Sequence, residues 1–156
     1  MTSSMKKVLT PKTIAQAIGP YSQGLLIGRT LFVSGQVGSD ANGKLVSGGL
    51  AEEFKQALLN VGEILKAGGC DFSNVVKSTV LLADINDFNL FNDVYKQFFK
   101  GSFPARSTYQ VAALPILTTR RLTTTARETP LLFLFKPEGA HLEIEVIAVQ
   151  GALTGI

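Results

Sequence analysis

Two segments of this chain repeat apolar residues at the 3.6-residue period of an amphipathic helix, and they limit the folds that the chain can adopt. The first predicted helix begins near Leu50 and ends at Gly68-Gly69. The second runs to about Phe99, can be capped by Asn86 or Asp87, and is closed by Gly101. The apolar stripes are Leu50, Phe54, Ala57, Leu58, Val61, Ile64 and Leu65 in the first helix, and Phe88, Phe91, Val94, Tyr95, Phe98 and Phe99 in the second. Two helices alone cannot form the core.

Strands must supply the rest of the core. Alternating and β-rich segments predict strands at 24–27, 31–36, 75–82, about 107–112 and 142–150, with a turn at 28–30 that joins the first two as a hairpin. Because the 75–82 strand follows a helix, we expect it to pair parallel with an earlier strand through a right-handed crossover. Five or six strands with two helices predict an α+β domain with a mixed sheet.

Two helices can cover only one face of such a sheet, and this predicts an oligomer. The strands at 24–27, 31–36 and 142–150 carry apolar side chains on both faces. In a chain with no further helical pattern, a second copy of the chain is the simplest cover for the other face. The 156 residues suffice for one domain that buries roughly two thirds of its unfolded surface.

The residue counts exclude several kinds of chemistry. The only cysteine is Cys70 and the only histidine is His141, so an internal disulfide, a cysteine-based zinc site and Ser–His–Asp or Cys–His systems have almost nothing to build on. We expect His141 to be a surface residue rather than a base. Five glycines match neither phosphate-binding loop and are interpreted as turn makers: Gly35, Gly38, Gly43, Gly48 and Gly49. Carboxylate acid–base chemistry and anion binding by arginine remain.

The cellular location is predicted from the absence of membrane-spanning and secretory segments. No apolar run approaches the ~20 residues of a membrane span, and the start of the chain does not have the pattern of a secretory signal. A single cysteine suits a reducing compartment. We therefore expect a cytoplasmic protein without a membrane partner, with a mitochondrial or nuclear pool as the alternative.

Six motifs in order resemble the signatures of the RidA/YjgF family of enamine and imine deaminases, most closely its animal branch. They are Ala17-Ile-Gly-Pro-Tyr-Ser-Gln23, Val33-Ser-Gly-Gln36, Val76-Lys-Ser-Thr-Val80, Asn86-Asp-Phe88, Phe103-Pro-Ala-Arg-Ser107 and Glu143-Ile-Glu-Val-Ile-Ala-Val149. The resemblance implies a chorismate-mutase-like fold and a homotrimer with its sheets facing a central barrel. It also implies active sites in clefts between subunits, without a metal or organic cofactor.

The resemblance further implies hydrolysis of 2-iminobutanoate and 2-iminopropanoate to 2-keto acids and ammonia. Arg106 matches the residue that anchors the substrate carboxylate, a task suited to a planar guanidinium. Glu143 matches the acid/base, and Glu145 has the same side-chain direction two residues on if the strand is regular. The other matching cleft positions are Tyr21, Ser34, Asn92 and Thr108, where cysteine is common in relatives.

Each of these residues also has an ordinary structural explanation. Arg106 alone would be a solvated arginine at a strand start, Glu143 an exposed strand carboxylate, and Asn92 a polar position on a helix. Two other functions stay open: an RNA-cleaving translation inhibitor, with RNA as partner, and a non-catalytic ligand-binding or chaperone-like trimer. The basic residues that could contact RNA phosphates concentrate in 116–137, and outside that segment acidic and basic residues balance.

Residues 116–137 interrupt the family pattern and are interpreted as an insertion in a single domain of residues 1–156. Joining Pro115 directly to Glu138 restores the expected sequence. We expect the half rich in threonine and arginine to be mobile and cut rapidly by trypsin, and the apolar Leu-Leu-Phe-Leu-Phe run to pack down or form a strand. Its position between the strands of Arg106 and Glu143 places it near the expected cleft.

Overall fold

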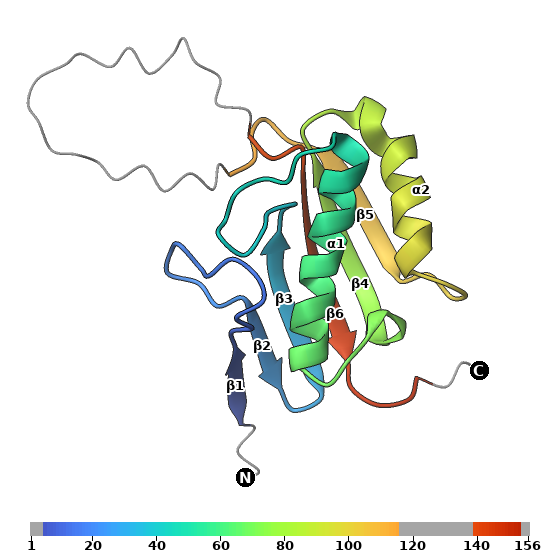
Figure 1. The fold of residues 1–156 in the computed structure, drawn as a ribbon. Coiled ribbons are helices and arrows are strands. Elements are labelled where there is room, and N and C mark those ends of the chain that lie inside the picture. Colours follow the sequence, from blue (N-terminus) through green and yellow to red (C-terminus); the bar gives the residue numbers. More distant parts are fainter. Residues whose placement is uncertain (1–4, 116–138, 154–156) are drawn as a thin grey trace, which may run out of the picture.

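A computed structural model describes residues 5–115 and 139–153, in which six strands form one sheet and two α-helices lie against the same face of it (Figure 1). The strands are β1 Lys6–Leu9, β2 Gly24–Ile27, β3 Thr30–Gln36, β4 Val75–Leu82, β5 Ala105–Gln110 and β6 Leu142–Val149. The helices are α1 Leu50–Ala67 and α2 Phe88–Phe98, and short 3-10 turns occupy Phe72–Asn74 and Ile85–Asp87. The expected insertion at 116–137 lies outside the described residues.

The order of the strands corrects one prediction. The sheet runs β1-β2-β3-β6-β4-β5, so β6 separates β4 from β3 and pairs antiparallel with both. The parallel partner of β4 is the later strand β5, reached through α2, and not an earlier strand. Periodicity identified the strands, but it carries no information on which strand inserts between two others.

The core forms between the helices and the sheet. Leu142, Ile144, Val146 and Ala148 of β6 alternate inward and are at most 2% exposed. The buried stripe of α1 packs on them, as its spacing predicts: Phe54, Ala57, Leu58, Val61, Ile64 and Leu65 are all fully buried. Side chains that alternate with the inward residues of β6 must therefore lie on the sheet face away from the helices.

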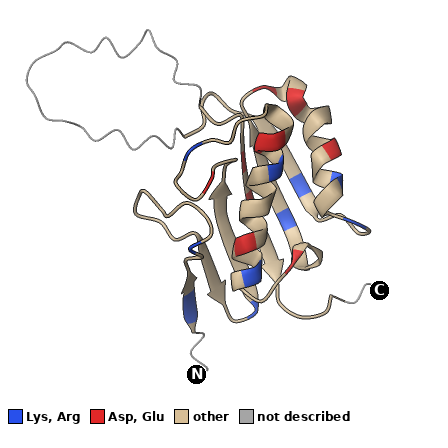
Figure 2. Ribbon diagram, viewed as in Figure 1, with Lys and Arg blue, Asp and Glu red and all other residues tan. Residues whose placement is uncertain are grey.

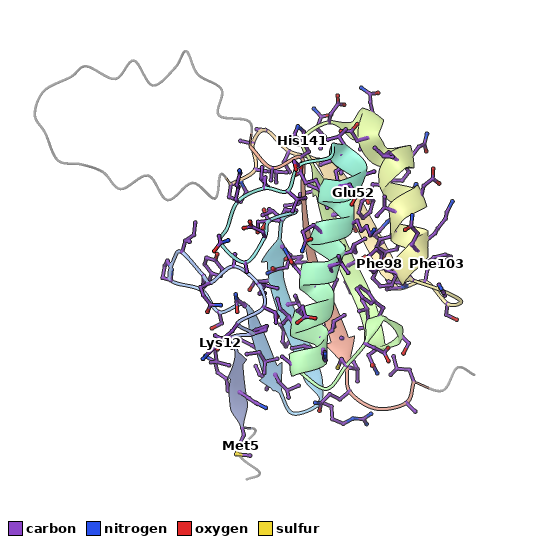
Figure 3. The ribbon with its side chains drawn as sticks, in the orientation of Figure 1. Met5, Lys12, Glu52, Phe98, Phe103 and His141 are labelled. Atoms are coloured by element: carbon purple, nitrogen blue, oxygen red, sulfur yellow. The ribbon has the colours of Figure 1, made fainter. Side chains whose placement is uncertain are left out.

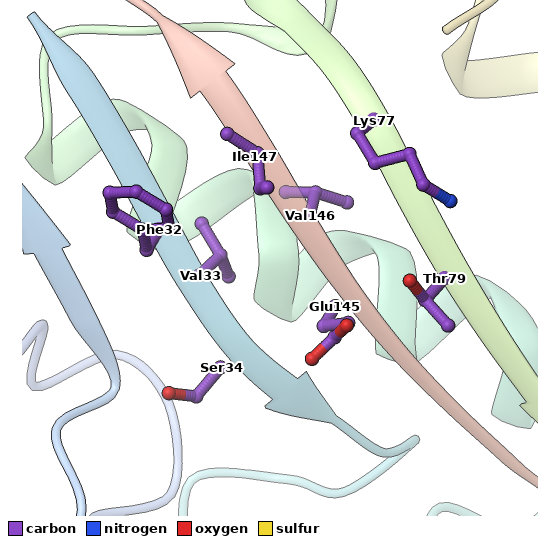
Figure 4. A pocket seen from close by; sticks show the side chains of 8 residues that line it. All are labelled: Phe32, Val33, Ser34, Lys77, Thr79, Glu145, Val146 and Ile147. Carbon is purple, nitrogen blue, oxygen red and sulfur yellow. The ribbon is translucent and has the colours of Figure 1, made fainter. Parts of the chain in front are cut away.

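That second face of the sheet is open and partly apolar in the single chain. Phe32 of β3 is 43% exposed and Tyr109 of β5 is 56% exposed. A hollow of about 220 Å³ crosses β3, β6 and β4 on this face, and Figure 4 views these strands with α1 behind them. The hollow is lined by Phe32, Val33, Ser34, Lys77, Thr79, Glu145, Val146 and Ile147.

Charge on the helix side is mixed. Glu52, Glu53 and Glu63 share α1 with Lys55 and Lys66, and Figure 2 shows both signs of charge along this helix.

No helix within residues 5–115 and 139–153 is long and apolar enough to cross a membrane.

Several element boundaries differ from those predicted. The edge strand β1 was not anticipated, and β5 begins at Ala105, two residues before its predicted start, so Arg106 lies within the strand. Asp87 occupies the N-cap of α2, but its side chain makes no capping hydrogen bond. The cap at this bend comes from Asp84, whose carboxylate accepts from the Asn86 amide at 2.9 Å.

Candidate active site

A cavity of about 360 Å³ lies where the loop before β2 meets β3 and β6. It brings together three of the residues singled out in the sequence, Glu143, Tyr21 and Ser34, and adds Glu145. Glu143 and Glu145 alternate with the buried residues of β6, so both carboxylates project from the open face of the sheet. The cavity is thus polar at its base, and Ile18, Val37 and Pro115 give it apolar walls.

Gly35 makes room for the carboxylate of Glu143. A Cβ atom at position 35 would lie 1.7 Å from Glu143 Oε1, so no other residue fits there without displacing the glutamate. The pairing of β3 with β6 shifts register between Val33 and Gln36, so Gly35 lies at an irregularity of the strand. The interpretation of Gly35 as a turn maker was therefore wrong, because the residue lies inside β3 and serves close packing.

Gly38 lies at a bend beyond β3, as a turn residue can, and it too permits close packing, since a Cβ there would meet the Glu53 backbone at 2.3 Å. Gly43, Gly48 and Gly49 do have positive φ angles, as turn residues often have. A glycine that permits close approach cannot be told from a turn glycine by local sequence, because the atoms that approach it are distant in the chain.

The environment of Glu143 favours its protonated form. Burial raises the pKa of the Glu143 carboxyl above its ordinary value, and the negative charge of Glu145 raises it further. A carboxyl group tuned in this direction holds its proton closer to neutral pH, as a group that alternately accepts and donates protons requires.

Ser34 and Tyr21 border the carboxylate in different ways. The Ser34 hydroxyl donates to the Ser22 carbonyl at 2.6 Å, and the Ser34 amide donates to the Gln23 carbonyl at 3.0 Å. Ser34 thereby ties β3 to the loop that carries Tyr21, whose side chain is 49% exposed at the cavity. The Gln23 side chain, which sequence reasoning did not single out, also lines the cavity and donates to the Ala15 carbonyl.

Arg106 lies in a second cavity, of about 420 Å³, at the edge of the sheet beneath α2. Its Nη2 donates to Asn92 Oδ1 at 2.7 Å, so the structure brings together these two predicted residues. Its guanidinium carbon lies 4.7 Å from the centre of the Tyr95 ring. Thr108 follows on the same strand, and its buried hydroxyl has no hydrogen-bond partner within residues 5–115 and 139–153.

One chain does not bring Arg106 and Glu143 together. Arg106 contacts the rings of α2 on the helix side of the sheet, whereas Glu143 lies in the cavity on the open side. The six predicted residues therefore form two groups: Glu143, Tyr21 and Ser34 on one side, and Arg106 with Asn92 on the other, with Thr108 next to Arg106 on β5.

The histidine expected at the surface has a buried partner. Glu53, 5% exposed, accepts from the His141 amide at 2.6 Å and lies 2.8 Å from His141 Nδ1, while the His141 side chain is 42% exposed. Figure 3 labels His141 at the first turn of α1. The pair fixes the start of β6 two residues before Glu143. Within the described part of the chain, no group of three or more His, Cys, Asp or Glu residues could hold a metal ion.

Comparisons of the sequence and of the fold with known proteins point to one family. The family model described as endoribonuclease L-PSP matches residues 11–120. A Bos taurus protein named 2-iminobutanoate/2-iminopropanoate deaminase is 56% identical, over 99% of this chain and 97% of its own length. The YjgF gene product from E. coli is 32% identical with a TM-score of 0.74, covering 93% of this chain and 99% of that one. E. coli TdcF with bound serine is 33% identical with a TM-score of 0.74 and the same two coverages. This chain belongs to the endoribonuclease L-PSP family, which is the RidA/YjgF family.

Proposed function

We propose that this protein hydrolyses 2-imino acids, among them 2-iminobutanoate and 2-iminopropanoate, to 2-keto acids and ammonia. The observation that carries the proposal is the half-buried Glu143 carboxyl, held against Gly35 in a cavity and with its pKa raised by burial. The bovine relative, which bears the name of this activity, supports the substrate class. So does the serine bound to E. coli TdcF, because serine is a small molecule with a carboxylate next to the carbon that bears nitrogen.

In the proposed reaction Glu143 moves the protons. Its carboxylate takes a proton from water as the water oxygen bonds to the imine carbon, and the electron pair of the C=N bond moves to nitrogen. The proton passes from Glu143 to that nitrogen, which gives a carbinolamine. Glu143 then takes the hydroxyl proton and delivers it to the amine, the C–N bond breaks, and ammonia leaves as the C=O bond forms. One water is consumed for each ammonia released.

Arg106 binds the substrate carboxylate in this scheme. A guanidinium presents paired N–H donors that fit the two oxygens of a carboxylate. Tyr21 and Ser34 border the reacting carbon, and Asn92 and Thr108 accompany Arg106. Because Arg106 and Glu143 lie on opposite sides of the sheet in one chain, the complete site requires the Arg106 edge of one subunit to face the Glu143 cavity of another.

A homotrimer provides this arrangement, and the open sheet face supports it. Phe32 and Tyr109 expose apolar surface there that a second and third copy would bury. Phe32→Asp should therefore reduce the mass in solution and abolish activity. Leu59→Asp is the matched control, because Leu59 of α1 is 44% exposed. A trimer that survives Phe32→Asp unchanged would argue against contacts through this face.

Ammonia release tests the function directly. The imine is generated in situ from an amino acid by an amino-acid oxidase, and ammonia is measured with and without the protein. We expect acceleration over spontaneous hydrolysis. Glu143→Gln should lose about 10²–10⁴ in rate, the usual contribution of acid–base catalysis, while Arg106→Ala should mainly lose substrate affinity. Absence of acceleration, or normal turnover by Glu143→Gln, would refute the proposal. Salt-sensitive RNA cleavage by the same sample would favour the alternative activity.

The proposed location is the cytosol, in keeping with a free, buried thiol at Cys70. Fractionation of cells with an antibody to the protein tests this, and recovery in washed mitochondria alone would contradict it.

A further inference from the structure

Three aromatic rings of α2 form the surface on which the Arg106 guanidinium rests. The guanidinium carbon is 4.7 Å from the centre of the Tyr95 ring, 5.5 Å from that of Phe88 and 5.6 Å from that of Phe91. Asn92 accepts a hydrogen bond from Arg106 and belongs to the same helical stripe. Phe91, Asn92 and Tyr95 follow Phe88 by three, four and seven residues, the spacing of one helix face. One face of α2 thus holds the arginine.

Tyr95 is the ring that is itself held in place on several sides. It is 3% exposed, and its hydroxyl lies 2.9 Å from the buried Ser78 hydroxyl. Ser78 is the register partner of Arg106 across β4 and β5, so the tyrosine links α2 to the strand beside the arginine. The Phe99 ring stacks on that of Tyr95, with the two ring centres 4.1 Å apart. Burial raises the pKa of the Tyr95 hydroxyl, which keeps it neutral.

Among the residues that the structure describes, this arrangement leaves donors of Arg106 free for a ligand. Asn92 accepts from one of the five guanidinium N–H groups, and aromatic rings offer faces rather than lone pairs. Within residues 5–115 and 139–153, the ion pairs are Lys96–Asp93 and His141–Glu53, so no carboxylate there neutralises Arg106. The cavity beside it is also lined by Phe103 and Pro104, and Figure 3 labels Phe103 near the C-terminal end of α2.

We propose that Tyr95 is a positioning residue for Arg106, fixing the plane of the guanidinium so that its free donor edge meets the substrate carboxylate. The inference rests on the proposed function, because it assigns that role to Arg106. Tyr95 contacts the arginine and not the reacting carbon. Its loss should therefore weaken binding of the carboxylate equally in the ground and transition states, which raises KM and leaves kcat unchanged.

The experiment measures binding without turnover. Calorimetry gives the Kd of 2-oxobutanoate, the expected product, and of its uncharged amide, for the parent protein, Tyr95→Leu and Tyr95→Phe. Tyr95→Leu should weaken 2-oxobutanoate binding about 2- to 30-fold, the span of cation–π contacts from exposed to desolvated sites, and should not affect the amide. Tyr95→Phe keeps the ring and should restore most of the affinity. Turnover measured alongside should give a raised KM, the parent's kcat and the parent's pH profile for Tyr95→Leu.

Two controls separate positioning from general damage to the core. Phe72→Leu removes a ring that packs on Phe98 and Phe99 and is not among the rings over Arg106, and it should leave the Kd unchanged. In an Arg106→Ala background, Tyr95→Leu should cause no further loss, because the contact that it serves is already gone. If Tyr95→Leu does not fold, Tyr95→Met replaces it: the flexible methionine fills the space of the ring, and loss of the ring should raise the Kd in the same way.

The outcomes distinguish this inference from the proposed function. Parent protein that binds 2-oxobutanoate while Tyr95→Leu binds it equally well would overturn the positioning role alone. The same holds for equal losses in Tyr95→Leu and Phe72→Leu, and for unchanged binding in Tyr95→Met where that variant stands in. Parent protein that neither binds 2-oxobutanoate nor releases ammonia would instead overturn the proposed function, and the role of Tyr95 with it.

Discussion

Arg106 and Glu143 project from opposite faces of the same sheet, Arg106 onto the aromatic rings of α2 and Glu143 into the cavity beside Gly35. Ser78 on β4 pairs with Arg106, and Leu81, three residues on, pairs with Glu143, so a single strand separates their two strands. Neighbouring strands do not place two side chains in one site when the pleat directs them apart. A reaction that uses both residues must therefore combine two subunits.

Complementation between inactive subunits tests this arrangement. Arg106→Ala and Glu143→Gln subunits, each inactive alone, should regain activity when they are unfolded together and reassembled. With random assembly in equal amounts, about one quarter of the shared sites receive both intact residues, so about a quarter of the parent's activity is expected. Ammonia release gives the activity, and native mass spectrometry confirms mixed trimers.

The matched control combines Glu143→Gln with Gly35→Ala, because both changes affect the same half of the cleft and should not complement. Mixed trimers of Arg106→Ala and Glu143→Gln that stay inactive would mean that no site is shared between subunits.

The pH dependence of the reaction should follow the carboxyl of Glu143. Its pKa is raised first by burial and then by Glu145, and the base form is needed to activate water. The acid limb of kcat/KM should therefore lie above the usual range of a glutamate, and Glu145→Gln should move it to lower pH. A pH profile of the two proteins checks this, and an unmoved limb would show that Glu145 does not act on the catalytic carboxyl.

The raised pKa of Glu143 should also make the stability of the fold depend on pH. A carboxyl with a raised pKa holds its proton more tightly in the folded state, so its contribution is present at low pH and is lost as pH rises through the raised pKa. Glu143→Gln should lack this decline. Denaturant unfolding at a series of pH values measures it.

Gly35→Ala should impair catalysis without touching the substrate anchor. The new Cβ would lie 1.7 Å from Glu143 Oε1, so the carboxylate must move, and because it ends a flexible side chain this displacement should cost little stability. We expect kcat to fall toward that of Glu143→Gln, with Kd for 2-oxobutanoate nearly unchanged. Gly62→Ala on α1, where the nearest atom is Phe72 Cε2 at 3.2 Å, is the control with normal turnover. Parent-like kcat in Gly35→Ala would mean that the carboxylate works from another position.

Deletion of residues 116–137 should leave a folded, active protein. Leu114 and Ala140 are buried in one small cluster with Val37, so the chain positions that flank the segment are already close in space. A short connection can replace a long one at little cost, because the closure entropy of a loop changes slowly with its length. Activity at least equal to the parent's is expected, from a trimer whose mass falls only by that of the deleted residues. A deletion variant that is insoluble would show that the segment belongs to the core.

Particular residues show how much of the fold can be predicted from the sequence. Local periodicity located α1 and α2 and the strands to within about two residues at most ends, because burial on one face leaves a repeating pattern in neighbouring positions. The ordered motifs identified the family, and the alternation along β6 placed Glu143 and Glu145 on one face. The edge strand β1 left no comparable pattern, since of its four residues only Leu9 is buried.

Other features were decided by tertiary structure alone. The insertion of β6 between β3 and β4, the fit of Gly35 to Glu143, the Glu53–His141 pair and the tyrosine beneath Arg106 all join residues that are distant in the chain. Local spacing does not encode such contacts, because they depend on which elements pack together and in what register. By itself the sequence determined the family and every element of the sheet and helices except β1, whereas packing of elements distant in the chain placed Arg106 and Glu143 on opposite faces of one sheet.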